Sequence, residues 1–297
     1  MTYDKNNRLL TYNGENVKYD KDGNMTYGPL QGRMTEFAFD CRNRLVKAGD
    51  TVYEYDAENN RIAVTTGTKR TEYVVNSQPE LSQVLQSTVR DTANKAAQPE
   101  TTYYFYGKRL ISQENKTDGY LTYHFNNVGS TMAVTNQKGE VVKEYAYSPY
   151  GELLLGESDG SIQFLYNGQF GVTTDANGLY YMRTRYYNVD IKRFVNQDVL
   201  TGTLERISSL NRYAYVEGNP VSFLDPFGLE KNVVDTLHEM IEKIQQYITV
   251  AMIGLSVAAA ISFALGAYVI TYYSAAWFDT LNSINTILTA INFALYT

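Results

Sequence analysis

The sequence predicts a mainly β protein, built from consecutive β-hairpins and followed by an all-α C-terminal segment at residues 230–297. Three observations predict this fold class. An aromatic–aspartate pair recurs in the first part, apolar and polar residues alternate between the pairs, and prolines and most charges disappear after Leu229. Alternation is typical of half-buried strands, because successive side chains of a strand point to opposite faces, whereas a long run that is apolar on every face indicates a helix.

Each aromatic–aspartate pair is followed by a turn and then by an apolar residue. The pairs are Tyr3-Asp4, Tyr19-Asp20, Phe39-Asp40 and Tyr55-Asp56. Aspartate caps its own turn and tolerates left-handed backbone, so each unit is predicted to be a strand, a turn and a return strand. Alternation in residues 51–66 and 140–154 supports this pattern. Residues 77–100 are polar and begin and end near proline, and we expect an insertion loop with room for a short helix there.

Composition excludes several functions. The net charge of −6 and the absence of a basic patch argue against nucleic acid as a partner. A single cysteine, Cys41, cannot form an internal disulfide, and with only His124 and His238 beside it no usual zinc site can form. Cys41 is expected to be a buried side chain with a packing role only. The glycines have hairpin spacing and form no phosphate-binding loop, so neither metal nor cofactor is expected.

The stretch from Tyr181 to Leu229, "YMRTRYYNVDIKRFVNQDVLTG…LNRYAYVEGNPVSFLDPFGL", closely resembles the closing domain of Rhs and YD-repeat proteins, a group that includes bacterial polymorphic toxins. The resemblance covers residues 1–229. It implies a YD-repeat region at 1–180, an Rhs-associated core at 181–229 and a variable toxin segment at 230–297. In this family the repeats wind as a spiral sheet into a shell that the core plugs. Family shells contain many more repeats, so the chain is expected to be the closing turns of a shell.

The resemblance also implies self-cleavage. Asp198 in "NQDVL" and Asp225 in "LDPFGL" correspond to the family's aspartyl peptidase pair, with Arg193 as the accompanying basic residue, and the cut falls between Leu229 and Glu230. Two carboxylates a few ångströms apart cannot both ionise, so one acts as an acid while the other activates water. The resemblance therefore predicts an intramolecular, single-turnover autoprotease.

One departure from the family bears on cleavage. The family has proline after the first aspartate, whereas Val199 follows Asp198 here, so the turn that presents Asp198 is expected to differ. The alternative is that both aspartates are turn residues and that Gly228 only supplies a positive φ.

The C-terminal segment has no charged residue from Ile244 to Phe278. Its apolar run at residues 250–273 would extend about 36 Å as a helix, enough for a hydrocarbon core of about 30 Å. We therefore expect a transmembrane helix. The residues expected to insert are Val250, Gly254, Ala258, Phe263, Gly266 and Tyr273. A second amphipathic helix is expected to start at Asp279 or Thr280. No catalytic constellation occurs in residues 230–297, so the toxin segment is expected to be non-enzymatic.

The leading hypothesis is the C-terminal part of an Rhs-type polymorphic toxin for interbacterial competition, which cleaves itself after Leu229 and releases a membrane-inserting, pore-forming segment. The expected partners are the target-cell membrane, a cognate immunity protein and secretion-system delivery proteins. The N-terminus lacks the basic start and apolar run of a signal peptide, so delivery by another route, or as part of something longer, is expected. The alternatives are a YD-repeat surface protein anchored by a transmembrane helix, a translocation segment of a truncated toxin, or a soluble core helix.

Overall fold

The computed structural model describes residues 1–79, 81–202, 207–229, 244–245, 248–253, 280–287 and 289. The chain divides into two units, with the boundary after Lys231. In the second unit the described residues are helical. None of the helices within the described ranges is long and apolar enough to cross a membrane. The predicted span at 250–273 is described only at 250–253, and its other residues lie outside the described part of the chain.

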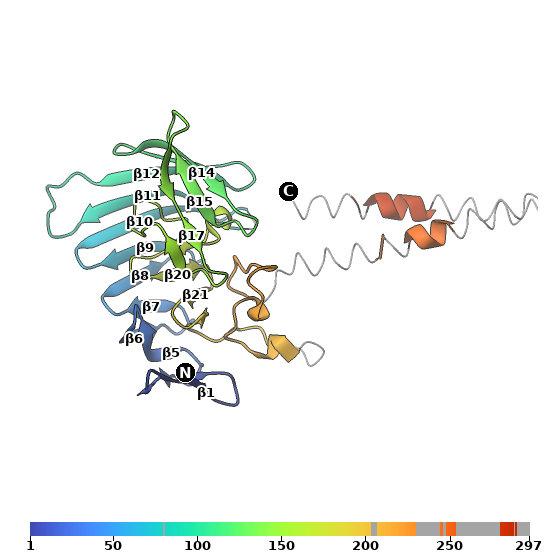
Figure 1. Cartoon of the computed structure of the whole chain (residues 1–297), viewed down its shortest axis with the longest axis horizontal. Coiled ribbons are helices and arrows are strands. Elements are labelled where there is room, and N and C mark those ends of the chain that lie inside the picture. Colours follow the sequence, from blue (N-terminus) through green and yellow to red (C-terminus); the bar gives the residue numbers. More distant parts are fainter. Residues whose placement is uncertain are drawn as a thin grey trace, which may run out of the picture. The chain divides into compact units, whose positions relative to one another are not determined.

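The first unit is mainly β, as the sequence predicts. Its largest element is an antiparallel sheet of 13 strands, β4 to β16, which we call the long sheet. Every strand in it pairs with its neighbours in the chain. Figure 1 shows most of these strands following one another along the unit. The strands are β4 (Lys18–Tyr19), β5 (Met25–Leu30), β6 (Arg33–Phe39), β7 (Leu45–Ala48), β8 (Thr51–Tyr55), β9 (Arg61–Thr66), β10 (Lys69–Asn76), β11 (Gln83–Asp91), β12 (Glu100–Tyr106), β13 (Leu110–Asn115), β14 (Gly119–Phe125), β15 (Thr131–Thr135) and β16 (Val141–Glu144).

Smaller elements flank this sheet. A three-stranded sheet precedes it, and a hairpin, a four-stranded sheet and three 3₁₀ helices follow it. Their bounds are β1 (Thr2–Tyr3), β2 (Leu9–Tyr12), β3 (Glu15–Asn16), β17 (Ala146–Tyr147), β18 (Leu153–Leu155), η1 (Gly168–Phe170), β19 (Thr173–Thr174), β20 (Leu179–Met182), β21 (Arg185–Asn188), β22 (Arg193–Phe194), η2 (Ile207–Leu210) and η3 (Val216–Gly218).

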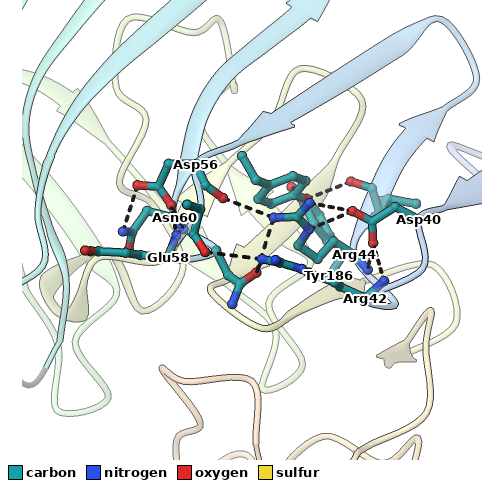
Figure 2. Close-up of polar contacts among 11 residues, drawn as sticks. Asp40, Arg42, Arg44, Asp56, Glu58, Asn60 and Tyr186 are labelled. Carbon is teal, nitrogen blue, oxygen red and sulfur yellow. Dashed lines mark hydrogen bonds and ion pairs between the residues drawn. The ribbon is translucent and has the colours of Figure 1, made fainter.

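The aromatic–aspartate pairs end strands, and their aspartates cap the turns, as predicted. In the turn between β6 and β7, Oδ1 of Asp40 accepts the backbone N–H groups of Arg42 at 2.9 Å and Arg44 at 3.0 Å. Neighbouring turns are also linked, because Nη1 of Arg44 donates to the carbonyl of Asp56 at 3.2 Å (Figure 2). Asp4, Asp20 and Asp56 accept backbone N–H groups in the same way. The repeat is therefore a series of turns between consecutive strands, each capped by its aspartate.

Two expectations are wrong. Residues 77–100 are not an insertion loop, because β11 is a nine-residue strand that pairs with both β10 and β12. Its β-branched residues favour a strand, and two partner strands satisfy its backbone groups, which outweighs its polar composition. The connection at 92–99 is an exposed loop. Cys41 is exposed, because it lies in the turn after Asp40.

The four-stranded sheet, β19 to β22, packs into the core of the long sheet, and from here on the closing domain means residues 173–229, which contain this small sheet and the loops after it. Leu179 and Tyr186 are buried in one cluster with Met25, Leu45 and Tyr53 from the long sheet. Burial of large apolar side chains is the main source of stabilisation here, at about 25 cal/mol per Å² of apolar surface. The closing domain is therefore fixed against the hairpins, which positions its loops.

Candidate active site

Asp198 and Asp225 converge on one guanidinium, that of Arg185 at the start of β21. Nη2 of Arg185 lies 2.7 Å from Oδ2 of Asp198 and 3.4 Å from Oδ2 of Asp225. Arg185 is 3%, Asp198 1% and Asp225 3% exposed. The guanidinium also lies over the ring of Phe194, 3.6 Å from the ring centroid. Two carboxylates that are 27 positions apart in the sequence thus share one buried countercharge.

The surroundings of Asp225 favour its protonated form. Burial and, to a lesser degree, the nearby charge of Asp198 raise the pKa of Asp225 to about 7, against the opposing effects of Arg185 and of the Leu229 N–H. Asp198 has the shorter contact to Arg185. One group is therefore suited to hold a proton near neutral pH while its neighbour stays paired with the guanidinium.

The loop before the expected cut folds around Asp225. Oδ1 of Asp225 accepts the backbone N–H of Leu229 at 3.0 Å, and its carbonyl accepts the N–H of Gly228 at 3.3 Å. Gly228 has a φ of +67°, as the alternative of a simple turn expects, and a Cβ there would lie 2.4 Å from the carbonyl oxygen of Met182. Only glycine meets both demands. The loop brings Leu229 within a hydrogen bond of the Asp225 carboxyl, whereas Glu230 lies outside the described residues.

The start of β21 fixes the same loop from the other side. The hydroxyl of Thr184 donates to the carbonyl of Phe227 at 2.6 Å or to that of Gly228 at 2.9 Å, and Nε of Arg185 donates to the carbonyl of Gly228. Arg185 thus orients both carboxylates and the chain next to them.

Asp198 keeps its position without a following proline. Its N–H donates to the carbonyl of Arg212 at 2.9 Å, and its Oδ1 accepts the N–H of Leu200 at 2.9 Å. Val199 is 70% exposed. The departure from the family pattern therefore falls on a side chain that faces solvent, while hydrogen bonds and Arg185 hold the carboxylate.

Arg193 does not join the pair. It lies in β22, donates through Nη1 to the carbonyl of Asn7, and stacks over the Tyr3 ring at 4.5 Å from the ring centroid. Arg185 occupies the place that sequence reasoning gave to Arg193. A signal was present in the sequence, because a charged residue in an otherwise apolar, aromatic strand requires a buried partner.

A cavity of about 850 Å³ opens beside the loop. Arg42, Arg44, Glu58 and Asn60 line it from the hairpin turns shown in Figure 2. Phe227, Leu229 and Arg185 line it from the closing domain. The cavity gives water a path to Leu229. Within the described ranges, no group of His, Cys, Asp and Glu side chains is suited to hold a metal ion.

The fold and this cluster define a class, a YD-repeat hairpin sheet packed against a closing domain with a carboxylate pair. The family model described as Teneurin YD-shell matches residues 1–221, and the chain belongs to this family. Its relatives place it among the Rhs and YD-repeat polymorphic toxins.

The relatives are much longer than this chain. The tRNA nuclease WapA of Bacillus subtilis (strain 168) is 31% identical over 235 residues, which cover 75% of this chain and 9% of the relative. The double-stranded DNA deaminase toxin A of Burkholderia cenocepacia (strain H111) is 26% identical over 238 residues, which cover 77% of this chain and 15% of the relative. The names of these two relatives both refer to nucleic acid. We therefore withdraw the expectation that nucleic acid is not a partner.

Solved structures show the same fold. A crystal structure of TcdB2-TccC3 has a TM-score of 0.51 and 19% sequence identity, with 72% of this chain and 13% of that chain covered. A TcdB2-TccC3-TEV structure has a TM-score of 0.51 and 22% identity, with 66% and 10% covered. At these identities the likeness concerns the fold alone.

Proposed function

We propose that the chain is the closing part of a YD-shell toxin and that it cleaves itself once, between Leu229 and Glu230. The observation that carries this proposal is the buried cluster in which Asp198 and Asp225 share Arg185, while Asp225 also accepts the N–H of Leu229 at 3.0 Å. A pair of carboxylates with one countercharge next to a peptide bond is the arrangement that acid–base hydrolysis needs.

The hydrolysis assigns one role to each carboxyl group. A water molecule adds to the carbonyl carbon of Leu229, and Asp198 takes the proton that the water loses. Asp225 donates its proton to the nitrogen of Glu230 as the carbon–nitrogen bond breaks. The products are a Leu229 carboxylate and a new amino terminus at Glu230. Because enzyme and substrate are one chain, orientation replaces binding and contributes much of the rate.

Intact-mass spectrometry of the purified chain tests this proposal. We expect two fragments, residues 1–229 and 230–297, and we expect the chain to remain whole in Asp225→Asn and in Asp198→Asn. Asparagine has nearly the shape of aspartate but cannot exchange the proton. Self-cleavage after Leu229 would be refuted if the chain of native sequence stays whole. It would also be refuted if both variants are cut as fully as the native chain.

For the released segment we propose membrane insertion and pore formation. Support comes from the sequence, in which residues 244–278 contain no charged side chain. Expression of residues 230–297 alone, with membrane potential as the readout and conductance across planar lipid films as the direct measurement, tests it. Growth without loss of potential contradicts the proposal and favours a surface protein held by a membrane anchor. A cognate immunity protein and delivery proteins complete the proposed toxin system.

A further inference from the structure

We propose that Arg183 is a positioning residue for self-cleavage. Its side chain holds the loop before the cut, residues 225–229, against the long sheet. The loop therefore has its reactive shape only when the closing domain is packed against that sheet. This inference rests on the proposed self-cleavage and adds a residue and a form of control to it. Four hydrogen bonds from one guanidinium carry the argument.

The guanidinium of Arg183 connects three segments that are far apart in the sequence. Its Nη1 donates to the carbonyl of Pro226, in the loop, at 2.5 Å. Its Nη2 donates to the carbonyl of Phe170, at the end of η1, at 2.8 Å and to the carbonyl of Ser82 at 2.9 Å. Its Nε donates to the Ser82 hydroxyl at 3.2 Å. Ser82 directly precedes β11, so the loop is bound to the long sheet through this one side chain.

All four acceptors are neutral. Within the described part of the chain, no carboxylate lies within ion-pair distance of Arg183. Burial lowers the pKa of Arg183 to about 10, against the opposing effects of Tyr181, Tyr106 and the charge of Asp225, and the group stays cationic at neutral pH. A planar group with five donors can hold several carbonyls in fixed directions, whereas a lysine ammonium cannot span them in the same way. The contacts therefore fit the fixing of a shape better than the neutralising of a charge.

The backbone at Arg183 supports a role for its side chain. Met182 pairs with Arg185, so Arg183 and Thr184 form the two-residue turn between β20 and β21. Arg183 has a φ of +57°, at a turn position where glycine is favoured. A non-glycine residue in the left-handed region persists when its surroundings over-determine it, and such residues cluster at functional sites.

The three residues from 183 to 185 all bind carbonyls of the loop, in order. Arg183 binds Pro226, Thr184 binds Phe227, and Arg185 binds Gly228. Arg183 also hydrogen-bonds to Ser82 and Phe170, and so links the loop to these two segments. Loss of its contacts is expected to free Pro226 while the Asp198–Arg185–Asp225 cluster stays in place.

Pulse-labelled cell-free synthesis of the full chain measures the first-order rate of cleavage. We expect Arg183→Lys to slow cleavage by about 10- to 100-fold, because a small misplacement of the reacting groups has effects of this size. The matched control is Arg61→Lys. Arg61 also joins the long sheet to the closing domain, but within the described residues its hydrogen bonds go to Asp175, Tyr186 and Thr173 and not to residues 225–229. We expect this control to lose stability and to retain a near-native rate. Equal slowing in both variants, or a native rate in Arg183→Lys, would overturn the proposal.

A second readout separates positioning from general destabilisation. Arg183→Ala should regain part of its rate on addition of guanidinium ion at millimolar concentration, because Arg183 borders the cavity of about 850 Å³ beside the loop. Asp225→Asn should gain nothing. Guanidinium destabilises folded proteins, so it cannot restore a rate that was lost through instability. The absence of rescue in Arg183→Ala would count against a positioning role.

Hydrogen exchange tests the same inference without cleavage. In an Asp198→Asn background, Arg183→Lys should speed exchange of the amides of Gly228 and Leu229, which both donate to Asp225, and Arg61→Lys should not. Unchanged protection of these amides refutes the role of Arg183 even if the native chain is never cut. An uncut native chain with faster exchange in Arg183→Lys would refute the proposed function and leave the positioning contact standing.

Discussion

Arg61 and Arg185 are both buried arginines that bind aspartates from the closing domain, yet their surroundings differ. Nη1 of Arg61 lies 2.7 Å from Oδ2 of Asp175, and its Nη2 donates to the Thr173 hydroxyl at 2.6 Å. Tyrosine rings surround the rest of this guanidinium, the nearest being Tyr181 at 4.1 Å from the ring centroid. Arg61 therefore has one carboxylate and satisfied neighbours, which is the pattern of a structural ion pair.

Arg185 instead faces two carboxylates, and one of them contacts a loop. Burial raises the pKa of Asp225 to about 7, and the charge of Asp198 acts in the same direction, so Asp225 is suited to hold a proton near neutral pH. The comparison teaches that burial and an ion pair alone do not mark a reactive site. The two clusters differ in two respects. Arg61 faces one carboxylate and Arg185 faces two, and one carboxylate of the Arg185 cluster, that of Asp225, accepts the N–H of Leu229.

The largest expected effect separates stability from cleavage. Asp175→Asn leaves Arg61 as an unpaired buried charge, so we expect the free energy of unfolding to fall by about 3–5 kcal/mol while the folded molecules still cleave. Asp198→Asn leaves Arg185 matched one to one with Asp225, so we expect a small change in stability and no cleavage. Urea unfolding and intact-mass spectrometry measure the two quantities. A large loss of stability in Asp198→Asn with cleavage retained would reverse the assignment of the two clusters.

The next effect concerns the backbone of the loop. Gly228→Ala places a methyl group 2.4 Å from the carbonyl oxygen of Met182, so we expect cleavage to slow by about 100-fold. Gly218→Ala is the matched control, because Gly218 also has a positive φ, of +84°, but its Cβ would meet only the Tyr150 hydroxyl at 3.9 Å. We expect near-native cleavage in the control. If the two alanine variants are slowed alike, the backbone strain is responsible and the close approach to Met182 is not.

The pH dependence of cleavage is the third test. The acid role requires a protonated Asp225, and its pKa is raised to about 7, so the rate should fall as pH rises through this value. Between about pH 6 and about pH 8 the protonated fraction drops about tenfold, and the rate should follow it. Time courses of cell-free cleavage at several pH values provide the measurement. A rate that increases over this range would exclude Asp225 as the acid.

The smallest effect concerns the departure from the family pattern. Val199 is 70% exposed, and the carboxylate of Asp198 is held by Arg185 and by the N–H of Leu200. We therefore expect Val199→Pro to change the cleavage rate by no more than about twofold, an effect that arises mainly from the unfolded state. A much larger gain would mean that the native turn holds Asp198 poorly.

Much of the fold could be predicted because it depends on local chemistry. Aspartate caps a turn through backbone groups two and four residues away, so Asp4, Asp20, Asp40 and Asp56 identify hairpins without any knowledge of the tertiary structure. The polar strand β11 was missed because its backbone partners lie on β10 and β12, and a propensity pattern does not show them. Cys41 was misplaced for a related reason, since burial depends on which face of a turn meets the core.

The candidate site was predictable only in part. Asp198 and Asp225 were identified through the motif around them, and the structure brings them together, but their arginine was misassigned. Arg185 and Arg193 are eight positions apart on neighbouring strands, and only the packing of β21 against the closing-domain core turns Arg185 toward the carboxylates.

The sequence by itself determined the hairpins and the positive φ at Gly228, because short-range hydrogen bonds and steric limits within a few residues decide these features, whereas the two aspartates were identified only through the resemblance of their motif to the Rhs family. The tertiary structure alone decided that two aspartates share Arg185, that Arg61 is saturated, and that Arg183 connects the loop to the long sheet. The reason is that a buried charge obtains its partner from wherever the chain packs, and strand pairing brings together residues that are distant in the sequence.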